Sequence, residues 1–174
     1  QLLSHALVTH RADSATLESV DLRRVAVEAE REARRTGGAT GIELDLPADP
    51  VMVTGDAFSL REAARNLITN ALAHGKRPVS LKVSLTIDGK AMISAQDAGP
   101  GMSADKLERI GQRFARDASN PQSAGLGLAI VAEVAEFHQG AIRTGRLAGG
   151  GFEVGIELPL AGLQSSLTAE ETPE

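Results

Sequence analysis

One stretch of the chain carries most of the fold prediction, and it reads DAFSLREAARNLITNALAH from Asp56 to His74. Its apolar residues recur every three or four positions, which is the spacing that puts them on one side of an α-helix. Asp56 stands just before this pattern, where a short polar side chain caps a helix N-terminus. We therefore predict a long helix from Asp56 to about His74, with a core-facing side made of Leu60, Ala63, Ala64, Leu67, Ile68, Ala71 and Leu72.

A second stripe of the same helix is polar. Glu62, Asn66, Asn70 and His74 follow one another at intervals of four residues, so their side chains lie along one line of the helix surface. Asn is a mediocre helix former, and two in register favour a function, because amide oxygens are hard ligands that suit Mg²⁺. A solvated face that happens to contain two asparagines is the alternative interpretation of this stripe.

The composition excludes several classes of protein. The chain has 174 residues, a net charge of −5 and no Cys, which removes disulfides, thiolate metal sites and cysteine nucleophiles. The acidic balance and an aromatic content of 2% argue against a nucleic-acid surface. No apolar run reaches the roughly 18 residues of a membrane span. The first residue is Gln1 and not a methionine, so we expect a piece of a longer protein.

Short strands and helices surround the long helix without the regular alternation of a doubly wound fold. Asp21 is the expected cap of an earlier helix that ends near Gly37, and Asp88-Gly89 is a strong hairpin signal. We therefore expect an α+β sandwich in which helices cover one face of a mixed sheet. The predicted strands span 42–46, 51–53, 79–87, 91–96, 141–145 and 151–158, and further helices span 103–110 and 125–137.

The chain's 18 glycines are clustered, and the first cluster follows directly on a predicted strand as Asp97-Ala98-Gly99-Pro100-Gly101. An aspartate at a strand end can accept a hydrogen bond from an exocyclic amine, and the glycines after it allow the backbone to turn beside a flat ligand. A plain turn is the alternative for this motif.

The second cluster, Gly125-Leu126-Gly127-Leu128, opens a predicted helix. Bare backbone N–H groups at a helix N-terminus favour anions such as phosphates. The motif lacks the Lys-Ser/Thr of a P-loop, so that class of enzyme is not indicated. Close packing of the glycines is the alternative.

Together, these motifs are much more specific than any one of them. In chain order, they resemble the ATP-binding domain of sensor histidine kinases, in the superfamily that includes type II topoisomerases, MutL-type repair ATPases and heat-shock chaperone ATPases. The resemblance covers about 21–160, includes the last strand from Gly150 to Pro159, and implies a Bergerat fold with a mostly antiparallel sheet. The matching motifs are Asn66–Ala71 as the N box, Asp97–Gly101 and Gly125–Gly127 as the two glycine boxes, and Arg113-Phe114 as the F box.

For the base of the nucleotide, the resemblance implies that Asp97 binds the adenine amino group. Guanine presents a carbonyl at that position, and a buried unpaired acceptor costs about 1–3 kcal/mol. Gly99, Gly101 and Met102 would line the adenine pocket, and His74 would pack beside the nucleotide.

For the phosphates, the resemblance implies that Asn70 holds Mg²⁺ and that Asn66 stands beside it in a catalytic position. The ATPase relatives have a Glu in place of Asn66 that activates water, and an amide cannot take that proton, which indicates a kinase that avoids hydrolysis. Residues 111–124 would form a lid that brings Arg116 to the γ-phosphate. The phosphates would meet the N–H groups of Gly125, Leu126, Gly127 and Leu128.

Three features depart from the family pattern. Ala73 stands where a basic residue is usual, Ser123 stands where a further glycine is common, and the lid is short. Lys76 and Arg77 are the nearest cations that would replace the missing phosphate contact.

The resemblance also divides the chain. Residues 1–19 would be the end of a dimerisation helix with its linker, 20–160 the catalytic domain, and 161–174 a disordered tail. Neither His5 nor His10 precedes an acidic residue as a phosphoacceptor histidine does, so the acceptor would lie upstream. His138, at a predicted helix end, is expected to be structural.

The implied function is to bind ATP–Mg²⁺ and to donate the γ-phosphate to a histidine on the absent dimerisation domain. A response-regulator receiver domain would then take the phosphoryl group. The parent would be a homodimer anchored in the inner membrane, and this domain would be cytoplasmic, with no contact to the membrane or to nucleic acid. The alternatives are a non-catalytic nucleotide-binding or scaffold module, and a Ser/Thr protein kinase of the anti-sigma type.

Overall fold

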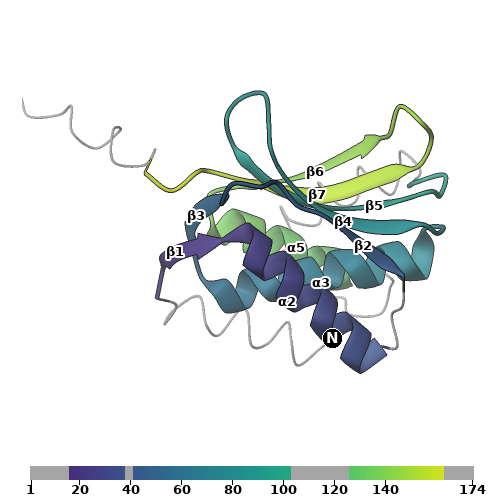
Figure 1. Cartoon of the computed structure of the whole chain (residues 1–174), viewed down its shortest axis with the longest axis horizontal. Coiled ribbons are helices and arrows are strands. Elements are labelled where there is room, and N and C mark those ends of the chain that lie inside the picture. The colour runs from purple at the N-terminus through teal and green to yellow at the C-terminus, as the bar shows by residue number, and fades with distance from the viewer. Residues whose placement is uncertain (1–15, 38–40, 103–125, 163–174) are drawn as a thin grey trace, which may run out of the picture.

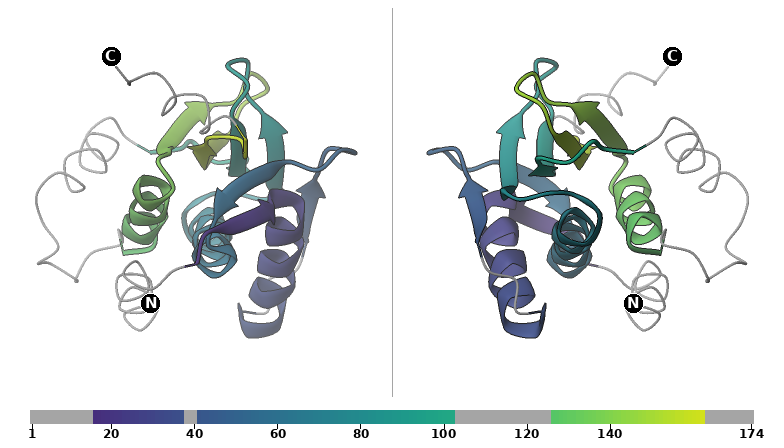
Figure 2. Two further views of the ribbon diagram at one scale, coloured as in Figure 1. Left: turned by 90° about the vertical axis from the view of Figure 1, so that its left-hand side faces the viewer. Right: turned by 90° about the vertical axis from the view of Figure 1, so that its right-hand side faces the viewer.

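The protein is built from two layers, a five-stranded sheet and a layer of helices that covers one face of it (Figure 1). A computed structural model describes residues 16–37, 41–102 and 126–162 of the chain. The side views show the helices on the same side of the sheet (Figure 2). The α+β sandwich expected from the sequence is therefore confirmed.

The large sheet has the strand order β2-β4-β5-β7-β6. Its first pair, β2–β4, is parallel, and the other three pairs are antiparallel, so the sheet is mixed but mostly antiparallel. The turn between β4 and β5 is the predicted hairpin, and Gly89 adopts a φ of 71° there, in the left-handed region that glycine accepts without strain. The strands are β2 (Ile42–Asp45), β4 (Val79–Leu85), β5 (Ala91–Asp97), β6 (Ala141–Arg146) and β7 (Phe152–Leu158).

A second sheet of two antiparallel strands, β1 (Glu18–Asp21) and β3 (Met52–Gly55), lies beside the first helix. Strand β1 was not predicted, and Glu18 and Ser19 were expected in a linker, because the partner strand lies far along the chain and β1 has no apolar alternation of its own. Strand β3 was predicted at 51–53, so the prediction began one residue too early and ended two residues too early. Helix α2 (Leu22–Gly37) follows β1 directly, and the Arg23 backbone N–H donates to Asp21 Oδ1 at 3.0 Å, as expected for the predicted cap.

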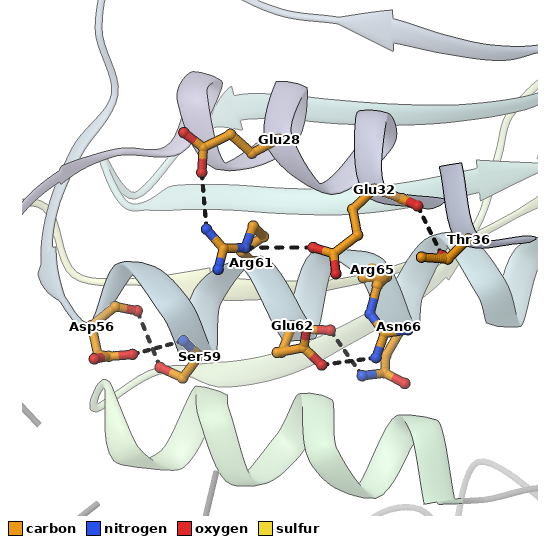
Figure 3. Close-up of polar contacts among 9 residues, drawn as sticks. All are labelled: Glu28, Glu32, Thr36, Asp56, Ser59, Arg61, Glu62, Arg65 and Asn66. Carbon is orange, nitrogen blue, oxygen red and sulfur yellow. Dashed lines mark hydrogen bonds and ion pairs between the residues drawn. The ribbon is translucent and has the colours of Figure 1, made fainter. Parts of the chain in front are cut away.

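The helix layer is centred on α3 (Ala57–His74), which lies between α2 and α5 (Leu126–Phe137) (Figure 3). Its fully buried residues Leu60, Leu67 and Ile68 belong to the core that all three helices share with the sheet. The predicted length of α3 and its core-facing side are therefore confirmed, with Leu72 partly buried at the margin.

Several expectations fall on residues outside the described ranges. These are the N-terminal helix, the helix at 103–110, the lid at 111–124 and the tail beyond 162. Among the helices of the described ranges, none is long and apolar enough to cross a membrane.

Candidate functional site

The N-terminus of α3 is fixed by a buried cap. Asp56 Oδ1 accepts a hydrogen bond from the Ser59 backbone N–H at 2.7 Å, and the Ser59 hydroxyl donates to the Asp56 carbonyl at 3.1 Å (Figure 3). Both residues are buried. The cap satisfies a donor that the first turn of a helix otherwise leaves unpaired, and it fixes where α3 begins.

His138 holds this cap from the far end of α5. The Asp56 backbone N–H donates to His138 Nε2 at 3.0 Å, and His138 Nδ1 lies 2.7 Å from the Val134 carbonyl oxygen. Because Nε2 accepts, the network assigns the proton to Nδ1 and the ring is neutral. Burial lowers the pKa of His138 below its ordinary 6.5, against the opposing effects of the Val134 carbonyl and the Asp56 carboxylate. The expected structural role of this histidine is confirmed.

The four residues of the polar stripe differ in their exposure. Glu62 and Asn66 are 6% and 2% exposed, Asn70 is half-buried and His74 is exposed. Helices α3 and α5 run antiparallel, because the start of α3 meets the end of α5 at His138 while Asn66 lies beside Gly127 at the start of α5. The stripe is therefore not a uniformly solvated face, and its buried residue Asn66 lies against the start of α5.

The side chain of Asn66 is oriented by contacts at both ends. Its amide Nδ2 donates to the Glu62 carbonyl one turn earlier at 2.8 Å (Figure 3). A Cβ atom built on Gly127 would lie 3.3 Å from Asn66 Oδ1. The first residue of the N box and the last glycine of the second glycine box, which lie far apart in the sequence, are therefore in contact.

Charged side chains surround this part of α3. Arg65 pairs with the buried Glu62 carboxylate at 2.8 Å, and Arg61 pairs with Glu28 and Glu32 on α2 (Figure 3). The pair to Glu62 compensates a buried carboxylate, since a buried charge is costly without a partner.

Asp97 ends β5, as the sequence analysis expected. Its carboxylate Oδ1 accepts from the Gly99 backbone N–H at 2.6 Å and from the Lys76 backbone N–H at 3.3 Å. The Ala98 N–H donates to the Lys76 carbonyl at 2.8 Å. The first glycine box is thereby tied to the turn that follows α3.

Three glycines enclose Asp97 from three parts of the chain. A Cβ built on Gly75 would lie 2.3 Å from Asp97 Cγ, and one on Gly99 would lie 2.6 Å from Asp97 Oδ1. A Cβ on Gly151 would lie 2.3 Å from the Asp97 carbonyl oxygen. Side chains at these positions would occupy the space of the carboxylate or its backbone.

Gly101 ends the first glycine box, and Met102 follows it. Gly101 has a φ of 77°, and a Cβ there would lie 2.3 Å from a ring carbon of the buried Phe152. Met102 is partly buried against the core. Glycine is therefore required at Gly101 for two reasons, backbone conformation and close packing.

The other predicted site residues are placed as follows. Leu128 is 5% exposed in the core, so only its backbone is available to a ligand. Leu126 begins α5, whereas Gly125, Arg113, Phe114, Arg116 and Ser123 lie outside the described residues. Ala73, which replaces the usual basic residue, is exposed.

The contacts of Gly75 and Lys76 with Asp97 were not predicted from the sequence, where Lys76 was considered only as a substitute phosphate contact. A glycine directly after a helix is commonly a cap and carries no sign of a distant partner. Only the approach of β5 to the end of α3 reveals their contact with Asp97.

No cluster of three or more His, Asp or Glu side chains that could hold a metal ion occurs in the part of the chain that the structure describes. The amide oxygen of the half-buried Asn70 is nevertheless a hard ligand of the kind that Mg²⁺ accepts together with waters and phosphate oxygens. The Asn70 amide oxygen therefore fits as a ligand of Mg²⁺ that is bound together with a phosphate group.

Comparisons with known proteins agree on one family. The model of histidine kinase-, DNA gyrase B- and HSP90-like ATPases matches residues 55–162. A probable sensor histidine kinase, TcrY of Mycobacterium tuberculosis, is 37% identical over 172 residues, which cover 94% of this chain and 36% of that protein. The chain spans about a third of the length of such curated relatives.

Solved structures show the same fold. The mycobacterial sensor histidine kinase MprB superposes with a TM-score of 0.64 at 30% identity, over 83% of this chain and 98% of that one. The ATP-binding domain of PrrB from Mycobacterium tuberculosis gives a TM-score of 0.64 at 27% identity, over 83% of this chain and 97% of that one.

Proposed function

The chain belongs to the histidine kinase-, DNA gyrase B- and HSP90-like ATPases, and from this premise we propose that it binds ATP–Mg²⁺ and donates the γ-phosphate to a histidine of a sensor kinase. The acceptor histidine belongs to the dimerisation domain of the same homodimeric kinase. The phosphoryl group then passes to an aspartate of a response-regulator receiver domain. The domain acts on the cytoplasmic side of a parent anchored in the inner membrane.

One observation carries the proposal: a single helix contacts both glycine boxes. Asn66 in the middle of α3 lies beside Gly127, and Gly75 at its end lies beside Asp97. At 1.5 Å per residue, these two contacts are about 14 Å apart along the helix. Such an arrangement suits an elongated ligand with an anionic end near Gly127 and a hydrogen-bonding base near Asp97.

At the end of the site near Asp97, adenine is selected because its exocyclic amine can donate a hydrogen bond. Both backbone N–H groups that reach the Asp97 carboxylate from described residues end on Oδ1, which leaves Oδ2 to accept from an exocyclic amine. A guanine carbonyl at the same place would face an acceptor, and the unpaired groups would disfavour binding by about 1–3 kcal/mol.

The phosphate end favours transfer over hydrolysis. Asn70 would hold Mg²⁺, which neutralises charge on the phosphates when bound. Asn66 has an amide that already donates to the Glu62 carbonyl and cannot act as a base toward water. In the transfer step, the acceptor imidazole nitrogen forms the bond to phosphorus, and the bond from phosphorus to the leaving ADP oxygen breaks. His74, Arg116 and the N–H groups of the second glycine box remain predicted contacts.

A two-component assay tests the proposal. The chain is mixed with the dimerisation domain of its own full-length kinase and ATP labelled at the γ-phosphate. We expect label on the histidine of that domain and little on this chain alone, because neither His5 nor His10 precedes an acidic residue as an acceptor histidine does. Intact ATP binding without transfer to any protein would favour the non-catalytic nucleotide-binding alternative, which Ala73 and Ser123 motivate. Label on a Ser or Thr of a partner protein would indicate the anti-sigma type of kinase.

The variant Asp97→Ala tests ATP binding at the proposed base pocket separately from phosphoryl transfer. The partly exposed carboxylate makes two hydrogen bonds to backbone, so its removal should leave the domain folded, while calorimetry should detect no ATP binding. Normal ATP affinity in this variant would show that the base does not bind at Asp97.

A further inference from the structure

We infer that the turn Gly75–Lys76, which lies outside the four family motifs, sets the base selectivity of the nucleotide site by holding the Asp97 carboxylate in place. Gly75 contributes by its lack of a side chain, and Lys76 contributes its backbone N–H. The inference rests on the proposed function, because it assumes that Asp97 meets the base.

Gly75 is a glycine for reasons of space. It is the C-cap of α3 with φ −88° and ψ −167°, an extended conformation that any residue adopts, so no backbone strain demands glycine. A Cβ at this position would lie 2.3 Å from Asp97 Cγ and 2.6 Å from Asp97 Oδ1. It would also lie 2.6 Å from the carbonyl oxygen of Ala71, which accepts the Gly75 N–H at 2.9 Å. The carboxylate therefore occupies the volume that a side chain would need.

Lys76 fixes the same carboxylate through its backbone. Its N–H donates to Asp97 Oδ1 at 3.3 Å, and its carbonyl accepts from Ala98 N–H at 2.8 Å. The turn thus holds both the side chain of Asp97 and the residue after it. With Oδ1 engaged by Lys76 and Gly99, rotation of the carboxylate is restricted and Oδ2 keeps one orientation toward a ligand.

A change in this turn should weaken the contact with the base of the nucleotide and leave the contacts with its phosphates unchanged. A displaced carboxylate loses its bond to an exocyclic amine, whereas the contact of Asn66 with Gly127, about 14 Å away along α3, is untouched. Affinity for a purine nucleotide without the amine should then change little. The turn is a positioning element, because it acts through Asp97 and touches no reacting atom.

The test compares the dissociation constants of ATP and purine riboside 5′-triphosphate, which lacks the amino group, in this chain and in Gly75→Ala. A hydrogen bond to a charged group contributes enough to predict that the unsubstituted chain prefers ATP by about tenfold or more. Gly75→Ala should lower this preference to about threefold or less. A partial loss of folding scales both apparent affinities by the same fraction and leaves their ratio unchanged, so the ratio separates selectivity from stability.

Gly145→Ala is the matched control, since a Cβ there meets nothing within 4 Å, and it should keep the full preference for ATP. Lys76→Pro is the second variant, to be used also if Gly75→Ala does not fold. It removes the N–H to Oδ1 while Gly75 already has the extended conformation that is favoured before proline, and it should lower the preference as well. A preference as high as that of the unsubstituted chain, in either folded variant, would overturn the inference. An unsubstituted chain that binds both nucleotides equally would instead refute the proposed adenine contact itself.

Discussion

The backbone N–H of Asp56 donates to Nε2 of His138 at 3.0 Å, although 82 positions separate the two residues in the chain. This bond joins the capped start of α3 to the end of α5. Since α3 carries the N box and α5 carries the second glycine box, the bond fixes the relative position of the two motifs at the end remote from the proposed phosphate site.

We predict that stability falls as the pH is lowered through the range in which His138 gains a proton. Burial lowers its pKa in the folded state below 6.5, so the unfolded chain binds the proton more readily. The free energy of unfolding is therefore highest above pH 6.5 and decreases as the pH falls from there toward the depressed folded-state value. Urea unfolding at pH 7.5 and pH 5.5 measures the difference.

His138→Gln is the control for this pH dependence, because its side-chain oxygen offers an acceptor to the Asp56 N–H but does not titrate. We expect the variant to lose less stability than the unsubstituted chain between these two pH values. Equal losses in both proteins would assign the pH dependence to other groups.

Gly55→Ala should destabilise the fold by about 1–3 kcal/mol, the usual cost of overpacking. The added methyl would lie 2.6 Å from His138 Cδ2, 2.7 Å from its Nε2 and 2.9 Å from Leu60 Cδ1. Chemical denaturation measures the loss, with Gly149→Ala as the control in open space. The cost should shrink in a His138→Ala background, and strict additivity of the two changes would contradict the contact.

Asp56→Ala should cost about 1 kcal/mol through loss of the cap on α3, within the usual range of 0.5–2 kcal/mol. The bond that is lost runs from the Ser59 N–H to Asp56 Oδ1. Asp56→Asn keeps an acceptor and should retain most of the stability. If the two variants were equally destabilised in thermal and urea unfolding, the capping bond would not be the cause.

Gly127→Ala should separate nucleotide binding from folding. Alanine is the better helix former by up to about 1 kcal/mol, so the stability of the domain should fall little or rise. The added Cβ would lie 3.3 Å from Asn66 Oδ1 and push it from its position, so calorimetry should show weaker ATP binding. Gly145→Ala serves again as the control, and unchanged ATP affinity in Gly127→Ala would mean that this contact does not matter to the ligand.

Much of the fold followed from local patterns. The spacing of Leu60, Leu67 and Ile68 predicted α3 and its buried side, Asp56 and Asp21 were identified as caps, and Asp88-Gly89 marked a hairpin. These features depend on residues within a few positions of one another, where side-chain period and backbone preference act directly. The family resemblance, carried by the order of the motifs, is confirmed by the matched family and by the solved relatives.

Other parts of the site could not be predicted in this way. The stripe from Glu62 to His74 has one period in the sequence, yet its first half is buried and its last residue is exposed. Strand β1 forms because β3 pairs with it, and the local sequence of neither strand predicts this pairing. Each of these features depends on an element that is distant in the chain.

The sequence by itself determined helices α2, α3 and α5, the caps of α2 and α3 and the hairpin, because each depends on residues close together in the chain. The order of its motifs determined the family. Only the tertiary structure decided which residues meet across the site: Asn66 with Gly127, His138 with Asp56, and Asp97 with Gly75. The reason is physical. Such contacts arise when packed helices and strands bring together segments that are distant in the chain. At Gly75, the sequence shows only a missing side chain and does not identify the residue that occupies the space.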